Sequence, residues 1–254
     1  MTSALRAVSE VHPVAAEGYA RVADLYERSR PSYPAEAVEW MAKRLALAPG
    51  RRVLDLAAGT GKLTRQLVPT GAEIVAVEPS DAMREQLAAA LPSVRALPGV
   101  AESIPLEDAA VDAVAVGHAF HWFDAERALR EIHRVLRPGG GLALAWNLRD
   151  DRDPLQQAIT ELLAPLDMGS LGEDTRRAPQ GSGLFGPAEE RWFRHPQELD
   201  EEALVARIAS ISYVAVAPPG ERGQIEARVR ELARERPPRF TFLYRTVVSI
   251  SRAS

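Results

Sequence analysis

The chain has 254 residues, which predicts one large domain, or one domain with a substantial insertion, and enough length to bury a sizeable core. Its hydrophobic content of 46% and charged content of 26% are average for globular proteins and exclude disordered, fibrous and membrane-spanning chains. It has no cysteine, which excludes disulfides, thiolate metal sites and a cysteine nucleophile, and its net charge of -4 offers no basic surface for phosphate backbones or anionic lipid.

The first segment, residues 1–10, lacks the charged and then apolar run of a signal peptide, and no stretch reaches the ~18 apolar residues of a transmembrane helix. We therefore expect a cytoplasmic protein that binds neither nucleic acid nor a membrane and has no metal site. Apolar residues at helical spacing predict a helix over residues 17–30. A second helix is predicted over 34–48, where Pro49 and Gly50 end it.

From residue 51 onward, short apolar runs alternate with amphipathic segments. The runs, which read as buried strands, occupy residues 51–61, 74–80, 111–120 and 141–147. The segments between them have apolar residues three and four positions apart, which predicts helices. These segments are residues 62–71, 81–92 and 124–140. Parallel strands need crossover helices, and strands covered on both faces are continuously apolar. The alternation therefore predicts an α/β fold with a doubly wound, mostly parallel sheet.

The alternation ends after Asn147. Residues 148–235 predict a partly helical insertion that could act as a lid, with a polar, Gly/Pro-rich stretch over 169–187 and a strand near 190–195. A β-branched and aromatic run over 239–251 predicts the closing strand of the sheet. We accordingly divide the chain into an N-terminal helical part of the cap (1–50), a ligand-binding core (51–147), the insertion (148–235) and the closing strand segment (236–254).

The segment from Val53 to Thr64 is the most informative part of the sequence. It combines a buried strand, the acid Asp55, and a turn with Gly59 and Gly61 that leads into a helix. Glycines let the backbone approach a ligand, and the N-terminus of a helix points free N–H groups at it. Glu78 ends the next strand, 17 residues beyond Gly61, where a carboxylate can accept hydrogen bonds from both hydroxyls of a ribose.

Two features argue against a dinucleotide. Such a site needs a third glycine three residues after the second, and Thr64 occupies that position. Asp55 near the end of its strand suits a cationic ammonium better than a pyrophosphate. An NAD-dependent oxidoreductase therefore remains only an alternative, as does a non-catalytic protein that senses the nucleoside-type ligand.

These residues resemble the class I methyltransferases that use S-adenosylmethionine. The resemblance covers roughly residues 17–148, and its matching segments are DLAAGTG, AVEPS, GVAESIPL, VDAVAVGHAFHWFD and LRPGG. It implies a seven-stranded, Rossmann-like methyltransferase fold, S-adenosyl-L-methionine as cofactor and S-adenosyl-L-homocysteine as product. The pattern YxxxRPxYP, from Tyr26 to Pro34, together with HAFHWFD is similar to a branch that includes trans-aconitate methyltransferases and natural-product enzymes.

The resemblance also implies residue roles. It places Gly59 and Gly61 at the methionyl and ribose part of the cofactor, Asp55 near the ammonium and Glu78 on the ribose diol. The other residues that it places at the cofactor are Pro79, Ala101, Glu102 and Gly117, of which Ala101 and Glu102 fall beside the adenine. Arg30 is a further candidate at the cofactor; it could pair with the methionyl carboxylate or with a substrate acid, or form only a surface ion pair. Many relatives carry aspartate where this chain has Val100, so the usual side-chain hydrogen bond to the adenine amino group is absent unless Glu102 replaces it.

Methyl transfer needs an aligned nucleophile and, where the acceptor loses a proton, a base. His118 and His121 follow the fourth strand; we favour His118 as the base and a structural role for His121, and Asp24 and Tyr26 are candidates to orient the base. Trp192 and Tyr213 are candidate aromatics facing the acceptor.

The acceptor is expected to be a small molecule. Two histidines near the methyl donor favour a natural-product indole, amine or phenol that loses a proton, and the indole diketopiperazine C-methylating enzymes are one group that this chain resembles. The alternative is carboxyl O-methylation of the trans-aconitate type. The sequence leaves the methylated atom, the stereochemistry and the oligomeric state open.

Overall fold

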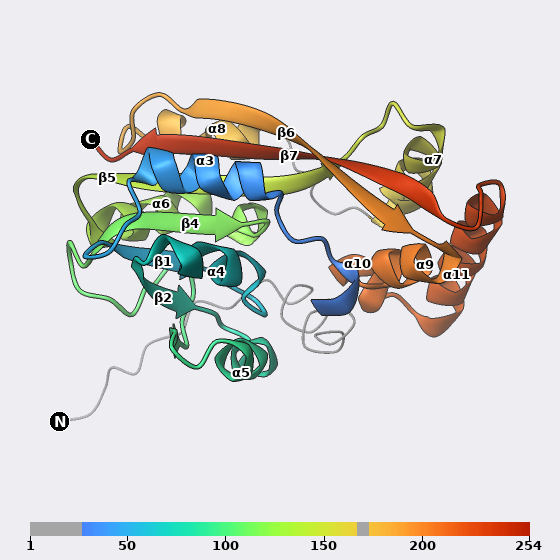
Figure 1. Ribbon diagram of the computed structural model, residues 1–254, viewed down its shortest axis with the longest axis horizontal. Helices are drawn as coiled ribbons and strands as arrows, with labels where there is room; N and C mark the ends of the chain where they lie inside the picture. Colours follow the sequence, from blue (N-terminus) through green and yellow to red (C-terminus); the bar gives the residue numbers. More distant parts are fainter. Residues whose placement is uncertain (1–26, 167–172) are drawn as a thin grey trace.

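The structure is a computed structural model that describes residues 27–166 and 173–254. Within them, seven strands form one sheet in the order β3-β2-β1-β4-β5-β7-β6 (Figure 1). The strands are β1 (Arg52–Leu56), β2 (Glu73–Val77), β3 (Arg95–Leu97), β4 (Val111–Gly117), β5 (Leu136–Arg149), β6 (Glu189–Leu199) and β7 (Phe240–Arg252). The first five pair in parallel, whereas β7 pairs antiparallel with both β5 and β6. This is the predicted seven-stranded, mostly parallel, Rossmann-like sheet.

Helices cover both faces of the sheet and one of its ends. They are α3 (Ala35–Leu45), α4 (Lys62–Leu67), α5 (Asp81–Ala90), α6 (Ala125–Val135), α7 (Pro154–Leu163), α8 (Glu173–Gly181), α9 (Glu201–Ala209), α10 (Ser212–Ala215) and α11 (Pro219–Arg234). On one face, Met41 of α3 and Leu67 of α4 pack on strand residues such as Val53. On the other face, Ile132 of α6 packs on the central strands. The strands are continuously apolar because both of their faces are buried.

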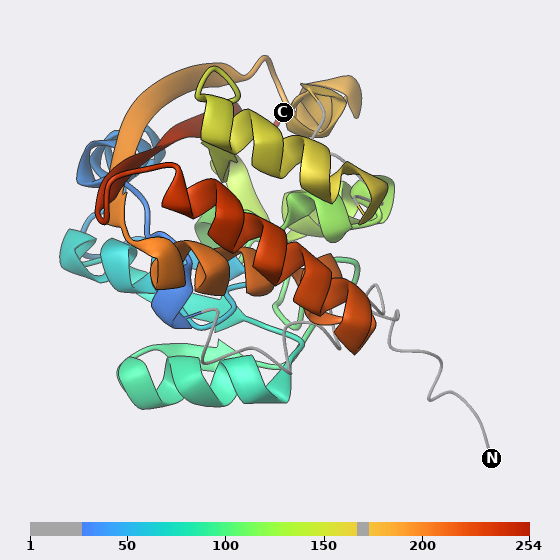
Figure 2. The ribbon, with the colours of Figure 1, turned by 90° about the vertical axis from the view of Figure 1, so that its right-hand side faces the viewer.

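Four helices form a cap beyond the carboxyl end of β4. The helical cap, as we name it, consists of α7, α9, α10 and α11, and it lies at the right-hand end of the molecule in Figure 1 and in front of the sheet in Figure 2. Its own core joins Ile159 of α7, Leu204 of α9 and Val229 of α11 to Phe242 and Tyr244 of β7. The long strands β6 and β7 therefore connect the cap to the sheet.

Several elements differ from the sequence-based expectations. Most of the helix expected over 17–30 lies outside the described residues. The part of it that the structure describes is helical at residues 27–29. The polar, Gly/Pro-rich stretch 169–187 contains α8, which has Pro179 in its last turn, two residues before its end. The strands expected near 190–195 and over 239–251 are present as β6 and β7. Among the described helices, none is long and apolar enough to cross a membrane.

Candidate functional site

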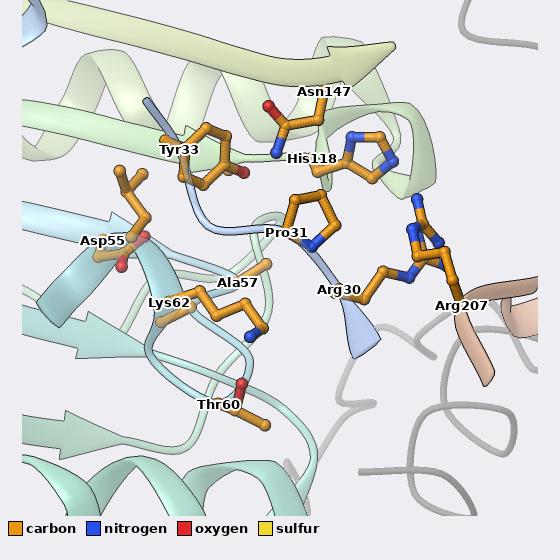
Figure 3. A pocket seen from close by; sticks show the side chains of 13 residues that line it. Arg30, Pro31, Tyr33, Asp55, Ala57, Thr60, Lys62, His118, Asn147 and Arg207 are labelled. Atoms are coloured by element: carbon orange, nitrogen blue, oxygen red, sulfur yellow. The ribbon is translucent and has the colours of Figure 1, made fainter. Parts of the chain in front are cut away.

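A pocket opens where the central strands end and faces the helical cap (Figure 3). Strands β2 and β4 lie on opposite sides of β1, and in open α/β sheets ligands bind at such a division, outside the carboxyl ends of the strands. Contributions come from the chain before α3, the turn after β1, the end of β4, β5 and α9. The lining residues are Arg30, Pro31, Tyr33, Asp55, Ala57, Ala58, Thr60, Lys62, Leu63, Gly117, His118, Asn147 and Arg207.

The turn after β1 has the backbone geometry expected of a ligand loop. Ala57, Gly59 and Gly61 have φ values of 56°, 58° and 84°, in the left-handed region that disfavours side chains larger than glycine. Gly61 is the N-cap of α4. The turn brings Ala57, Ala58 and Thr60 and the start of α4 to the pocket, whereas Gly59 and Gly61 do not line it. The contact of these two glycines with a ligand remains a prediction.

Asp55 carries the most unusual electrostatics of this turn. Its carboxylate is buried, and Oδ2 accepts a hydrogen bond of 2.5 Å from the hydroxyl of Thr64, whereas Oδ1 has no hydrogen-bond partner within the described residues. Burial, together with the charge of Glu78, raises the pKa of Asp55 to about 7. A buried acceptor without a partner costs free energy, and a cationic donor in the pocket would satisfy it.

Glu78 lies directly after β2, and its side chain is turned toward the glycine turn. Oε2 accepts a hydrogen bond of 2.8 Å from the N–H of Gly59, and Oε1 accepts one of 2.9 Å from the N–H of Ser80. Burial raises the pKa of Glu78, and the two backbone N–H groups oppose that shift. Each carboxylate oxygen retains a second lone pair for a ligand hydroxyl.

The residues expected beside an adenine lie after β3. Val100 and Ala101 are buried, whereas Pro79 and Glu102 are half-buried. Glu102 accepts a hydrogen bond of 2.8 Å at Oε1 from the backbone N–H of Asp124, so this carboxylate already has a structural contact in the loop before α6. None of these residues lines the pocket described above. Whether they read an adenine ring remains a prediction.

His118 and His121 occupy the loop after β4. His118 has φ 55°, its backbone N–H donates to Ala145 over 2.7 Å, and its ring centroid lies 5.7 Å from that of His121. The Nδ1 atoms of both rings are buried without a hydrogen-bond partner in the described structure. Desolvation, with the charges of nearby arginines, lowers the pKa of His121 to about 4 and that of His118 well below its usual value. Both rings are therefore neutral at pH 7, and only His118 lines the pocket.

Sequence analysis missed three pocket residues. Arg207, on α9, is buried and lies across the pocket from the glycine turn. An arginine on the apolar face of a helix, between Leu204 and Ile208, is the signal that could have found it. Lys62 pairs with Glu27 over 3.5 Å. Asn147 donates a hydrogen bond of 3.0 Å to the carbonyl of Ser32, which joins β5 to the chain before α3.

Other candidates lie elsewhere or outside the described residues. Arg30 lines the pocket but donates hydrogen bonds of 3.1 and 3.2 Å to the side chain and carbonyl of Ser210, at the end of α9. Asp24 and Tyr26 fall outside the described residues. Trp192 and Tyr213 do not line the pocket; Trp192 is 40% exposed on β6. Whether these two aromatic side chains face an acceptor remains a prediction.

Within the described ranges, no group of three or more His, Asp or Glu side chains could hold a metal ion. What the pocket offers instead is a buried carboxylate with one unpartnered oxygen, Oδ1 of Asp55, on one side, and Arg30, Arg207 and the neutral ring of His118 on the other. It is therefore suited to a ligand with a cationic group at one end.

Known proteins similar to this chain identify its family. The family described as "Methyltransferase domain" matches residues 54–144. An uncharacterised methyltransferase of Mycobacterium tuberculosis is 44% identical over 212 residues, which are 84% of this chain and 84% of the relative. An uncharacterised methyltransferase of Schizosaccharomyces pombe is 35% identical over 214 residues, which are 84% of this chain and 85% of the relative.

Solved structures agree on the fold. The YcgJ protein of Bacillus subtilis superposes with a TM-score of 0.59 at 19% identity, covering 87% of this chain and 99% of its own. A geranyl diphosphate methyltransferase in complex with SAM superposes with a TM-score of 0.52 at 14% identity, covering 87% of this chain and 85% of its own. At these identities the likeness shows the fold alone. By its sequence relatives, the chain belongs to the methyltransferase-domain family and is a methyltransferase.

Proposed function

We propose that this enzyme uses S-adenosyl-L-methionine as methyl donor and releases S-adenosyl-L-homocysteine. The observation that carries the proposal is the buried carboxylate of Asp55, whose Oδ1 has no hydrogen-bond partner in the described structure and which lines the pocket beside a left-handed glycine turn. An ammonium group would satisfy that oxygen and restore the charged form of the acid. The methyltransferase solved in complex with SAM shares the fold and so supports the choice of cofactor.

The residues present fit this cofactor. Asp55 would hold the methionyl ammonium, the turn with Gly59 and Gly61 would pack against the methionyl and ribose part, and Glu78 would bind the ribose diol. Pro79, Ala101 and Glu102 would flank the adenine, with Gly117 below the reactive end and Arg30 near the methionyl carboxylate. When bound, the cofactor supplies an electrophilic methyl group on a positively charged sulfur.

The chain itself aligns the acceptor with the methyl group, excludes water from the pocket and supplies a proton acceptor. Burial, the charge of His121 and the neighbouring arginines lower the pKa of His118, so its ring is neutral and can accept a proton from an acceptor nucleophile. The ring of His121 packs against the ring of His118, and His121 does not line the pocket. Asp24 and Tyr26 remain candidates to orient the base. We place His118 first among the catalytic candidates.

The acceptor proposed on the sequence evidence is a natural-product nucleophile, an indole, amine or phenol, that loses a proton to His118. The second candidate is carboxyl O-methylation of the trans-aconitate type. One observation favours this second candidate, namely Arg207 in the pocket, because a carboxylate acceptor needs a cation more than a base. Alkaline hydrolysis of the product separates the two, since a methyl ester releases methanol and a C-, N- or O-aryl product keeps its methyl group.

The helical cap is proposed to act as the lid that excludes water during transfer. Arg30 supports this role, because its hydrogen bonds to Ser210 tie the chain before α3 to the end of α9. Arg207 of α9 lines the same pocket as the glycine turn. Closed sites of this kind strengthen electrostatic interactions inside them.

Calorimetric titration with S-adenosylhomocysteine tests the proposed cofactor. We expect one site per chain in the unmodified protein and loss of binding in Asp55→Asn, with reduced nicotinamide cofactor as the comparison ligand. The control variant Asp108→Asn removes an exposed acid that pairs with Arg134 outside the pocket, and it should bind as the parent does. Binding of the nicotinamide cofactor without binding of S-adenosylhomocysteine would reject the proposed cofactor.

A further inference from the structure

Arg207 is a buried cation for which the described structure supplies no anion. Its side chain is on the cap helix α9 and it is 5% exposed. Nε donates a hydrogen bond of 2.7 Å to the hydroxyl of Tyr244, and the guanidinium lies 5.5 Å from the centroid of that ring. Nη1 is buried without a hydrogen-bond partner. The protein therefore fixes the guanidinium through Nε, whereas the buried Nη1 has no acceptor in the described structure.

The charges around Arg207 are of its own sign. Burial, together with Arg30 and Arg149, lowers the pKa of Arg207 to about 10, and only the phenol of Tyr244 opposes the shift. The same three arginines lower the pKa of His118, so all of them act on the corner of the pocket where β4 ends. Figure 3 shows Arg30 and Arg207 reaching this corner from different parts of the chain, next to His118.

This arrangement is costly without a ligand. Taking an ion out of water costs several kcal/mol even after relaxation, and like charges nearby add to that cost. Buried guanidinium groups in proteins are normally paired, and the planar fork of arginine matches the geometry of a carboxylate. Asp55 lines the opposite side of the pocket and is the acid that the proposed cofactor would engage.

From this geometry we infer that the acceptor carries a carboxylate, which binds to the unpartnered guanidinium nitrogen Nη1 of Arg207 beside Arg30 and His118. The inference rests on the proposed function, since it names the class of acceptor for that reaction. Tyr244 is a positioning residue in this scheme, because it fixes Arg207 through Nε. The carboxylate either is the methylated group or anchors a molecule whose second group loses a proton to His118.

The two versions predict different products and share one binding step. In the first version, one carboxylate oxygen stays on Arg207 while the other forms the new O–CH₃ bond as the methyl–sulfur bond breaks, and the product is an ester. In the second, the bond forms at a separate carbon, nitrogen or phenol oxygen, and the proton goes to the ring of His118. Alkaline release of methanol from the product distinguishes them.

Matched acid and amide probes test the binding step without turnover. Indole-3-acetate and indole-3-acetamide, 4-hydroxyphenylacetate and its amide, and trans-aconitate would be titrated into the complex with S-adenosylhomocysteine. We expect at least one acid to bind roughly tenfold or more tightly than its neutral partner, which is the amide for the two aromatic acids and the trimethyl ester for trans-aconitate. A roughly tenfold difference in affinity is the scale of one charge-assisted hydrogen bond. Arg207→Met should abolish that preference, and Tyr244→Phe should reduce it.

Arg149→Met is the matched control, because it also removes a cation that acts on His118, but at a residue outside the pocket lining. It should keep most of the preference for acids. Equal affinity of every acid and its neutral partner, or binding of no acid in the panel, overturns the inference. Failure of the parent protein to bind S-adenosylhomocysteine speaks instead against the proposed cofactor, so the two failures are distinguishable. Circular dichroism of Arg207→Met establishes that the variant is folded.

Discussion

The backbone N–H of Gly59 donates a 2.8 Å hydrogen bond to Oε2 of Glu78, which joins the glycine turn after β1 to the acid after β2. The two residues follow the neighbouring parallel strands β1 and β2, whose carboxyl ends lie side by side. The acid thus has a structural contact as well as its proposed contact with ribose. Removing it affects both the conformation of the turn and the ligand.

Glu78→Ala should weaken binding of S-adenosylhomocysteine by about 1.5 to 3 kcal/mol, the scale of hydrogen bonds to a charged group. The N–H of Gly59 also loses its acceptor, so the melting temperature should fall modestly. Calorimetric titration measures the affinity. Glu73→Ala is the control, because Glu73 lies at the opposite end of β2 and makes an exposed ion pair with Arg52. An affinity unchanged within a factor of two in folded Glu78→Ala would mean that Glu78 is not the ribose ligand.

The stability of the ligand-free protein should depend on Asp55. Its pKa is raised to about 7 in the folded chain from 3.8. Between about pH 4 and pH 7 the folded chain holds a proton that the unfolded chain has lost, so this group makes stability fall as the pH rises through that window. Asp55→Asn should flatten this part of the profile. Urea denaturation of both proteins at pH 5 and pH 8 measures the difference.

The same acid predicts how ligand binding depends on pH. An ammonium at Oδ1 favours ionised Asp55, so binding of S-adenosylhomocysteine below pH 7 should release a proton and weaken as the pH falls. Calorimetry in two buffers of different ionisation enthalpy reports the released proton. Proton uptake at pH 6 would show that Asp55 does not meet a cation.

His118 and His121 should differ in what their loss affects. His118→Asn should lower turnover by ~10²-fold or more, the usual contribution of a general base, while binding of S-adenosylhomocysteine stays within a few-fold. Asparagine is chosen because it tolerates the left-handed backbone that His118 adopts. His121→Asn should mainly lower the melting temperature. If the two variants exchange these effects, the roles are the reverse of those proposed.

Much of this site could be predicted because its signals are local in the sequence. Asp55, Gly59 and Glu78 follow buried strands at fixed offsets, and parallel strands bring their ends to one edge. Arg207 could not be found in this way, because no local motif shows that a residue of α9 lines the same pocket as the end of β4. The helix α8 was missed because the glycines and prolines around it read as loop, although residues 173–178 favour a helix.

Arg207 should also control the protonation of His118. Its charge lowers the pKa of His118, together with His121, Arg30 and Arg149. Removing one positive charge favours the protonated ring, so Arg207→Met should raise the pKa of His118. Nitrogen NMR of labelled imidazole, with His118→Asn to assign the signal, measures the shift. An unchanged pKa would show that the guanidinium is too far away or too well screened to act on this ring.

The last prediction concerns Gly117, which the sequence places at the reactive end of the cofactor. A Cβ on Gly117 would lie 2.7 Å from the hydroxyl oxygen of Tyr33 and 3.3 Å from Cδ2 of Leu63. Tyr33 cannot easily retreat, because its backbone N–H and carbonyl are both bound to the side chain of Gln66, at 2.9 and 2.6 Å. Gly117→Ala should therefore destabilise the protein by about 1 to 3 kcal/mol, the usual cost of overpacking.

A second variant identifies the cause of that loss. Tyr33→Phe removes the hydroxyl that a methyl at Gly117 would meet, so Gly117→Ala should cost less in the Tyr33→Phe background than in the parent protein. Urea denaturation of the four proteins gives the coupling free energy, and titration with S-adenosylhomocysteine shows whether the pocket end is displaced. Equal costs in both backgrounds would mean that the contact with Leu63, rather than the tyrosine hydroxyl, requires glycine at the end of β4.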